Sequence, residues 1–368
     1  MSKRLVPPAV VSLLVLASCT DAPTALDAAA GPLNSVSADG HGTVVMSGLN
    51  APRGLAWGPG GALYVAEAGT SEINGPCVPL PRGENCYSGT GSVSRLWNGQ
   101  QERVFTGLPS VFNPAAMDIG GVHDLEFHAD GSASFTVGWG GPPEARAGFG
   151  PAGEHFGTLV RATSAASGTI VDIAAFEQVN NPAGGPLDSN PYGLLVEGNR
   201  RYVTDAGGNS LLEVRNGEVS LVAVFPNRPV PPPLDEIIPF SEAVPTEVQR
   251  GPDGALYVSI LSGAPFPPGG AGIYRVTPGA EPELYAGFTA VLDFAFAPDG
   301  GVFVLEFAAE PFLGGNGSLV HVARDGARTV VTDQLTAPTS VLVGRDGSVY
   351  VTNRGVEPGA GEVLRFSR

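Results

Sequence analysis

The stretch LNAPRGLAWGPGGALYVAEAGT, residues 49–70, constrains this chain most, because degraded copies of it recur further along the sequence. In each copy, apolar residues alternate with smaller ones on both sides of a short connector, which is the pattern of two strands joined by a tight turn. The connector holds a Gly or Asn that tolerates a positive φ. The further copies begin at Gly121, Asn190, Val244, Val291 and Ala337.

Each copy is followed by further alternating stretches, so that one repeat predicts four strands. The predicted third strands begin at Ser92, Gly157, Ser210, Gly272, Ser318 and Glu362. The predicted fourth strands begin at Glu102, Ile170 (IVDIAAF), Val219, Glu283 and Arg328. Strand-only repeats of this length are typical of propeller blades. We therefore expect an all-β fold, a six-bladed β-propeller.

The sixth copy lacks a fourth strand because the chain ends at Arg368. The segment HGTVVMSGL, His41 to Leu49, has the pattern of a fourth strand and precedes the first copy. Pairing the two ends of the chain would remove an exposed sheet edge. We predict that this N-terminal strand, residues 41–49, closes the last blade, and that residues 41–368 form one propeller domain.

The N-terminus predicts export. Lys3 and Arg4 precede an apolar run that is too short for a membrane span, so residues 1–18 are typical of a signal peptide. The ending LASC resembles a bacterial lipobox, which would make Cys19 the lipidated first residue; an ordinary signal with an incidental cysteine is the alternative. Residues 19–40 are rich in Ala, Asp, Ser and Pro and predict a flexible tether. We expect a periplasmic or cell-surface lipoprotein, held to the membrane by its lipid anchor.

The formal net charge of −16 limits the partners. An acidic surface repels nucleic acid, so the expected partners are a small molecule or a protein, and we expect a monomer. Connections between the first two strands of a repeat are short, whereas long ones follow the second and fourth strands. In a propeller these long connections share one face, and loops on a rigid scaffold commonly carry binding. We call this the loop-rich face.

Aligning the copies predicts a site on that face, at the mouth of the central channel. The candidate binding residues are Arg53, Glu67, His123, Asp124, Tyr192, Asp205, Glu247, Asp293, Glu306 and Asn353. Oxygen ligands in a ring suit Ca²⁺ or Mg²⁺, and His123 also leaves room for a transition metal or for acid–base work. The alternative is that these side chains bond loop amides and that water fills the channel.

Two groups of loop residues complete the predictions. Cys77 and Cys86 share one loop of an exported chain, which predicts a disulfide. Aromatic rings and a histidine in other long loops could line a cleft or anchor the loops; they are Trp139, Phe149, His155, Phe240 and Phe266. The sequence contains no nucleophile elbow, phosphate loop, dinucleotide fingerprint or His-Glu-x-x-His motif, which argues against an ordinary hydrolase or kinase.

Several loop segments resemble a known family. The segments LNAPRGLAWGPGGALYVAEAGT, GSVSRLWNGQQERVFTGLPS, VTDAGGNSLLEV and VPTEVQRGPDGALYVSILSGAPFPPG, with the Cys77/Cys86 loop, are similar to the ScyD/ScyE family of exported propellers of the NHL or SMP-30 type. The resemblance implies a binding or pathway-accessory lipoprotein and carries over no catalytic residue. The chain also resembles the six-bladed lactonase and quinoprotein sugar dehydrogenase group, which implies the alternative of a divalent-metal-dependent enzyme.

Overall fold

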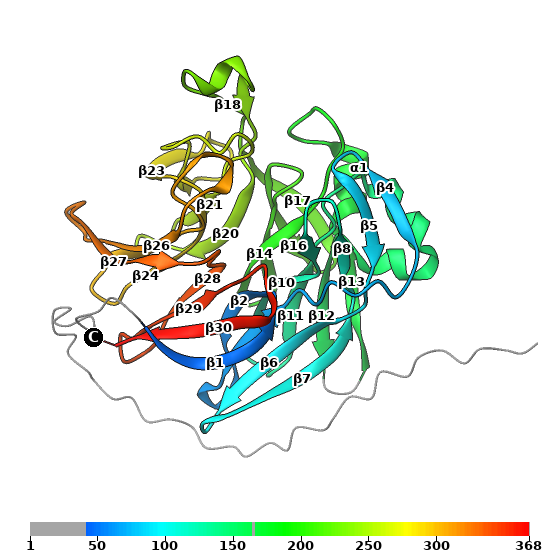
Figure 1. Cartoon of the computed structure of the whole chain (residues 1–368), viewed down its shortest axis with the longest axis horizontal. Helices are drawn as coiled ribbons and strands as arrows, with labels where there is room; N and C mark the ends of the chain where they lie inside the picture. The colour runs from blue at the N-terminus through cyan, green and yellow to red at the C-terminus, as the bar shows by residue number, and fades with distance from the viewer. Residues whose placement is uncertain (1–41, 164–165, 368) are drawn as a thin grey trace, which may run out of the picture.

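The computed structural model describes residues 42–163 and 166–367, and within them the chain is all-β (Figure 1). The predicted signal peptide (1–18), Cys19 with its predicted lipid, and the tether (19–40) lie outside the described residues. The described residues contain one α-helix, α1 (Ile173–Asn180), and four 3-10 segments, of which the longest is Pro143–His155. No described helix has the length and apolar character needed to cross a membrane.

Five sheets, which we call the first to the fifth, each take four strands from one repeat. The observed strands follow the predicted repeats closely. Alternate residues of each strand pack against the neighbouring sheets, and this packing is what the alternation of apolar residues in the sequence indicates. Their strands are β2 (Pro52–Trp57), β3 (Leu63–Glu67), β6 (Gly91–Trp97) and β7 (Gln100–Leu108); β10 (Val122–Phe127), β11 (Ala133–Val137), β12 (Thr158–Thr163) and β13 (Ala166–Asp172); β14 (Pro191–Glu197), β15 (Arg200–Asp205), β16 (Ser210–Arg215) and β17 (Glu218–Val224); β20 (Pro245–Arg250), β21 (Leu256–Ile260), β22 (Ala271–Val276) and β23 (Glu283–Phe288); and β24 (Val291–Phe296), β25 (Val302–Glu306), β26 (Gly317–Val322) and β27 (Arg328–Leu335).

The sixth sheet joins the two ends of the described chain. Strand β1 (Thr43–Asn50) pairs antiparallel with β30 (Pro358–Phe366), and the order continues to β29 (Val349–Asn353) and β28 (Ser340–Val343). Met46 and Leu49 bury their side chains in the core beside this pairing. The segment predicted as a strand at 41–49 is thus a strand at Thr43–Asn50.

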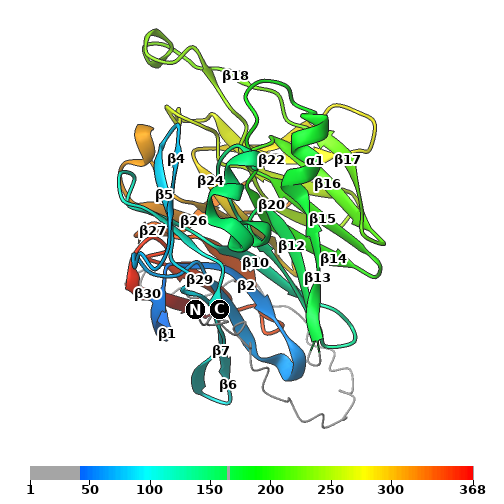
Figure 2. The same ribbon diagram turned by 90° about the vertical axis from the view of Figure 1, so that its right-hand side faces the viewer.

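The first strands of the six sheets contact one another in sequence. Strand β2 packs against β10, β10 against β14, β14 against β20, β20 against β24, β24 against β28, and β28 against β2. Apolar side chains pack between neighbouring sheets; for example, the rings of Tyr64 and Phe127 lie 4.5 Å apart between the first and second sheets. Figure 2 shows the sheets side by side, with helix α1 beside the second and third.

The loop that contains the two cysteines is more ordered than the sequence predicts. It supplies β4 (Cys77–Leu80) and β5 (Gly83–Tyr87) to a small additional sheet, and the connection after β7 completes this sheet with β8 (Val111–Asn113) and β9 (Asp118–Gly120). Cys77 lies directly opposite Cys86 in this sheet, and the predicted disulfide between them is confirmed.

The prediction that IVDIAAF, residues 170–176, is one strand is wrong. Strand β13 ends at Asp172, and helix α1 begins at Ile173. The Asp172 carboxylate accepts a hydrogen bond from the backbone N–H of Ala175, which satisfies a free donor in the first helical turn. Ile173 and Ala174 are fully buried, so the helix contributes apolar side chains to the core.

A second local hairpin lies in the Pro-rich connection between the third and fourth sheets. Strands β18 (Arg228–Pro229) and β19 (Phe240–Ser241) pair over two residues, and the segment between them projects from the molecule (Figure 1).

Candidate functional site

In three of the six sheets, a polar side chain at the start of the first strand connects the sheet to the next one. Each of them bonds a backbone carbonyl that begins the following sheet's first strand. The contacts are His123 Nδ1 to Pro191 O (3.1 Å), Thr246 Oγ1 to Val291 O (3.3 Å) and Thr339 Oγ1 to Pro52 O (2.7 Å).

Arg53, the predicted mouth residue of the first sheet, is buried and bonded on two sides. Its guanidinium donates to the carbonyl of Gly355 in the sixth sheet's loop, and to Ile119 O at 2.8 Å in the small sheet. Arg53 therefore bridges three parts of the molecule, and its main hydrogen-bonding capacity is used within the protein.

In the second, fifth and sixth sheets, the next residue along the first strand forms a second set of connections. Asp124, Asp293 and Ser340 each accept a hydrogen bond from a backbone N–H of the following sheet. The donors are Leu194 N (2.8 Å), Val341 N (2.8 Å) and Leu55 N (3.1 Å). Two of the predicted binding residues, Asp124 and Asp293, are therefore inter-sheet connectors.

Glycines make room for the carboxyl groups in this layer. A Cβ on Gly54 would lie 2.1 Å from Asp124 Oδ1, and a Cβ on Gly193 would lie 3.0 Å from Glu247 Oε2. Burial raises the pKa of Asp124 and of Glu247 well above the ordinary range, and nearby carboxylates add to both shifts. Burial also raises the pKa of Asp293 to about 7.

His123 and Tyr192 stack where the second and third sheets meet. Their ring centroids lie 4.5 Å apart. Burial is the main cause that lowers the pKa of His123, to about 3, and the nearby Arg53 cation adds to the effect. The imidazole is therefore neutral at physiological pH. Burial likewise raises the pKa of Tyr192 to about 12. A neutral imidazole beside the Pro191 carbonyl donates from Nδ1, and with this pKa it is a weak general base.

The four predicted residues at the ends of second strands hold their own sheets' entering loops. Each side chain accepts a hydrogen bond from the backbone N–H of the connection that leads into its sheet. The pairs are Glu67 with Asn50 N (2.5 Å), Asp205 with Asn190 N (2.6 Å), Glu306 with Thr289 N (2.8 Å) and Asn353 with Thr336 N (2.7 Å).

These contacts give the carboxylates predicted as possible Ca²⁺ or Mg²⁺ ligands hydrogen-bonding roles within the protein. The fifth sheet contributes two of them, Asp293 and Glu306, and both accept backbone N–H groups. In the described parts of the chain, the only three possible ligands within 4.8 Å of one another are Cys77, Glu84 and Cys86, and both cysteines are in the disulfide. The residues present therefore do not fit a bound divalent cation.

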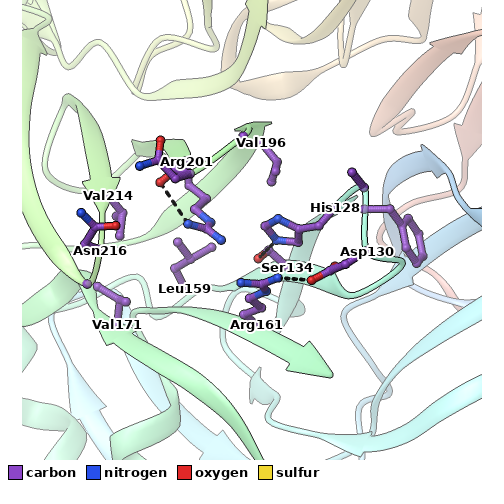
Figure 3. A pocket seen from close by; sticks show the side chains of 15 residues that line it. His128, Asp130, Ser134, Leu159, Arg161, Val171, Val196, Arg201, Val214 and Asn216 are labelled. Carbon is purple, nitrogen blue, oxygen red and sulfur yellow. Dashed lines mark hydrogen bonds and ion pairs between the residues drawn. The ribbon is translucent and has the colours of Figure 1, made fainter. Parts of the chain in front are cut away.

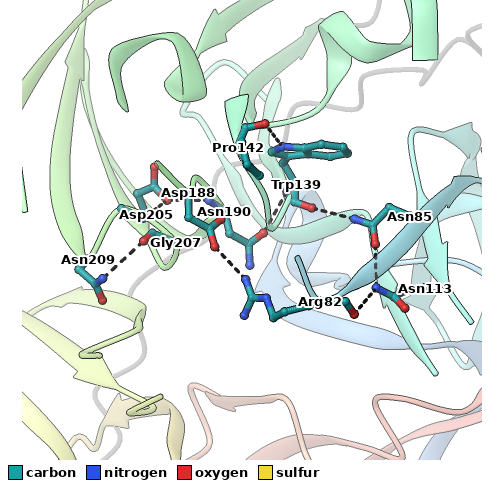
Figure 4. A network of polar contacts seen from close by, with 11 residues as sticks. Arg82, Asn85, Asn113, Trp139, Pro142, Asp188, Asn190, Asp205, Gly207 and Asn209 are labelled. Atoms are coloured by element: carbon teal, nitrogen blue, oxygen red, sulfur yellow. Dashed lines mark hydrogen bonds and ion pairs between the residues drawn. The ribbon is translucent and has the colours of Figure 1, made fainter. Parts of the chain in front are cut away.

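A polar network on the loop-rich face ties the small sheet to the second and third sheets (Figure 4). Asn85 Nδ2 donates to Trp139 O (3.4 Å), and Trp139 N donates to Asn190 Oδ1 (3.0 Å). Arg82 pairs with Asp188 at 2.8 Å. Trp139 and Phe149 are buried in the core beneath this network, so they anchor loops and do not line a cleft, whereas His155 and Phe240 are exposed.

Three carboxyl groups, those of Glu177, Asp188 and Asp205, lie close together beside this network. Glu177 is only 2% exposed. Burial is the main cause that raises the pKa of Glu177, to about 7, and the nearby carboxylates of Asp205 and Asp188 add to the effect. Burial raises the pKa of Asp188 to about 6, against the opposing effect of Arg82.

The loop-rich face also contains a cavity of about 370 Å³. Its wall is dominated by prolines and glycines of two connections, with one arginine and two serines. The lining residues are Pro226, Arg228, Pro229, Pro231, Ser241, Ser262, Pro267, Pro268, Gly269 and Gly270.

Hydrogen bonds hold the loops around this cavity together. Ser241 Oγ lies 2.7 Å from Ser262 Oγ, and the backbone N–H of Phe312 donates to Pro265 O at 2.9 Å. Phe240 and Phe312 remain more than half exposed beside it.

A larger cavity, of about 710 Å³, lies between the second and third sheets, toward the tight-turn side (Figure 3). Sequence reasoning missed its polar residues, which include His128, Arg161 and Arg201. Their positions in or beside short turns made that side look featureless, and nothing in the alternation pattern shows that two neighbouring sheets leave a space there.

No protein-family model and no curated protein sequence matches this chain. Similar solved structures include catalytically inactive virginiamycin B lyase from Staphylococcus aureus with quinupristin, at 14% identity and TM-score 0.48, covering 89% of this chain and 87% of the lyase. A gluconolactonase from Xanthomonas campestris is 12% identical, with TM-score 0.48 and 88% of both chains covered. Both are β-propellers. The likeness concerns the fold alone.

Proposed function

We propose that the chain is a six-bladed β-propeller, closed by β1, that binds a small molecule or a protein on its loop-rich face as an exported lipoprotein of the ScyD/ScyE type. The ring is supported by the cyclic contacts of the six first strands and by the pairing of β1 with β30. Export agrees with the disulfide, since such bonds persist in oxidising compartments.

One contrast carries the proposed binding function. Around the axis, Asp124, Asp293 and their neighbours are occupied by bonds between sheets, whereas the loop-rich face presents an open cavity. Its volume of about 370 Å³ suits a small ligand, since ligand sites commonly measure about 300–1,000 Å³. Its proline-rich wall is stiff, which reduces the entropy lost on binding.

A screen of aromatic fragments by thermal shift, followed by an occluding variant, tests this function. Pro268 lines the cavity, so Pro268→Trp fills it. Pro114 is exposed on the same face outside the cavity, which makes Pro114→Trp the matched control. We expect fragments that raise the Tm of the wild type and of Pro114→Trp but not of Pro268→Trp. Fragments that stabilise all three proteins equally would remove this cavity as the site.

The second candidate is an enzyme of the lactonase-like or quinoprotein dehydrogenase-like kind. The observation that favours it is the pKa of Asp293, raised to about 7, because such a carboxyl holds a proton that it can donate near neutral pH. The metal-dependent form of this candidate lacks a fitting ligand set, so the catalytic group would be a carboxyl. Turnover of a panel of lactones that is insensitive to EDTA and lost in Asp293→Asn would favour the enzyme; absence of turnover by the folded wild type would exclude lactonase activity on that panel.

A further inference from the structure

The cavity of about 710 Å³ has an apolar floor and a polar rim. Leu159, Val171, Val196 and Val214 line it from the second and third sheets. Figure 3 shows Arg161 and His128 on one side of the space and Arg201 on the other. The lining is therefore amphipathic, with apolar side chains beneath and cationic groups at the edge.

The two arginines differ in how they are paired. Arg161 donates to Asp130 Oδ2 at 2.6 Å and to Ser132 Oγ at 3.1 Å. Arg201 donates to the backbone carbonyl of Asn199 at 3.1 Å, and among the described residues it has no carboxylate within ion-pair distance. Most of the Arg201 guanidinium donors are thus available to a ligand.

The neighbouring groups make this spot positive. Burial is the main cause that lowers the pKa of Arg201 from its ordinary value. The Arg161 cation adds to this effect because the two guanidinium groups lie near one another. His128 bonds Ser134 Oγ at 2.8 Å, and burial, Arg161 and Arg201 lower its pKa, which favours the neutral imidazole. Among the described residues, Asp130 is the only acidic one that lines the cavity, and Arg161 already pairs with it.

We infer that this cavity binds a small organic carboxylate with an apolar body, independently of the loop-rich face. The planar guanidinium of Arg201 matches a carboxylate with two parallel hydrogen bonds. The apolar body would lie on Leu159, Val171 and Val214. In a chain with a net charge of −16, most of the surface repels anions, so the local excess of positive charge marks where one can be held.

The test measures binding of naphthoate and of its uncharged amide, naphthamide, to the whole purified chain, by the fluorescence of the naphthyl group. The first variant is Arg201→Gln. The matched control is Arg345→Gln, which removes the same charge from an exposed turn outside the cavity. The Tm of each variant shows whether it is folded.

We expect naphthoate to bind the wild type and Arg345→Gln alike, and Arg201→Gln about tenfold or more weakly, as for the loss of a hydrogen bond to a charged group. Naphthamide should bind the wild type and Arg201→Gln equally, and inorganic phosphate should compete poorly because it lacks an apolar body. Equal affinities for naphthoate and naphthamide, equal effects of the two substitutions, displacement of naphthoate by phosphate at low concentration, or no binding to the wild type would each overturn the inference.

Discussion

The carboxylate of Asp124 accepts a hydrogen bond from the backbone N–H of Leu194, 70 residues further along the chain, at 2.8 Å. This contact joins the second sheet to the third at their innermost strands. The repeat of the same relationship at Asp293 and Val341 indicates that residues aligned by the repeat serve first to hold neighbouring sheets together.

Replacing Asp124 with Ala should therefore destabilise the protein. The substitution leaves the buried Leu194 N–H without its partner, which typically lowers the free energy of unfolding by about 1–3 kcal/mol. Asp333→Ala removes an exposed carboxylate and should change it by less than about 0.5 kcal/mol. Urea unfolding measures both values, and similar effects of the two substitutions would contradict the connecting role of Asp124.

Gly54→Ala should be destabilising for a related reason. The added methyl would lie 2.1 Å from Asp124 Oδ1 and 2.9 Å from its Cα, so the second sheet would have to move. Overpacking of this kind typically lowers the free energy of unfolding by about 1–3 kcal/mol. Gly287→Ala is the control, since its nearest neighbour would be 3.9 Å away. A Gly54→Ala protein as stable as Gly287→Ala in urea would show that these sheets are not closely apposed.

The buried carboxyl of Glu177 predicts a pH dependence. Its pKa is raised from 4.5 to about 7, so the folded chain holds this proton more tightly than the unfolded chain does. The associated stability is fully present below pH 4.5 and is lost as the pH rises through about 7. We expect the free energy of unfolding to fall over this interval by on the order of 1 kcal/mol more in the wild type than in Glu177→Gln.

The exposed Glu218 provides the comparison for that experiment. Glu218→Gln should keep the wild-type pH profile in urea unfolding between pH 4.5 and 7. If Glu177→Gln has the wild-type profile as well, the proton is not held at Glu177.

Removing β1 should disrupt the domain. Deletion of residues 42–50 would expose the edge of β30 and remove the buried Met46 and Leu49 side chains. We expect the deleted chain to unfold or to oligomerise, as measured by size-exclusion chromatography and thermal melting. A monomer with an unchanged Tm would count against closure of the last sheet by β1.

The sequence predicted the strands well because alternation and turn glycines are local signals. It failed at Ile170 to Phe176, where a short apolar run fits a strand or a helix equally, and where the Asp172 cap decides the outcome. The hairpin around Cys77 and Cys86 was missed because its strands are short and pair partly with β8, a segment farther along the chain.

The sequence placed the candidate residues along the strands but did not predict their hydrogen-bond partners. The alignment placed His123 and Asp124 at the start of a first strand, where the structure has them. Their hydrogen-bond partners, Pro191 and Leu194, belong to the next repeat, and no pattern within one repeat reveals such a contact. The cavity beside Arg201 depends in the same way on the packing of two sheets.

Hydrogen–deuterium exchange with a saturating aromatic fragment tests the proposed binding function most directly. We expect slower exchange at the non-proline amides of residues 226–231 and 262–270, two segments that contain lining residues of the loop-rich cavity, and unchanged exchange in the first strands around Arg53 and His123. Protection of those first strands, with none in the two cavity segments, would contradict it.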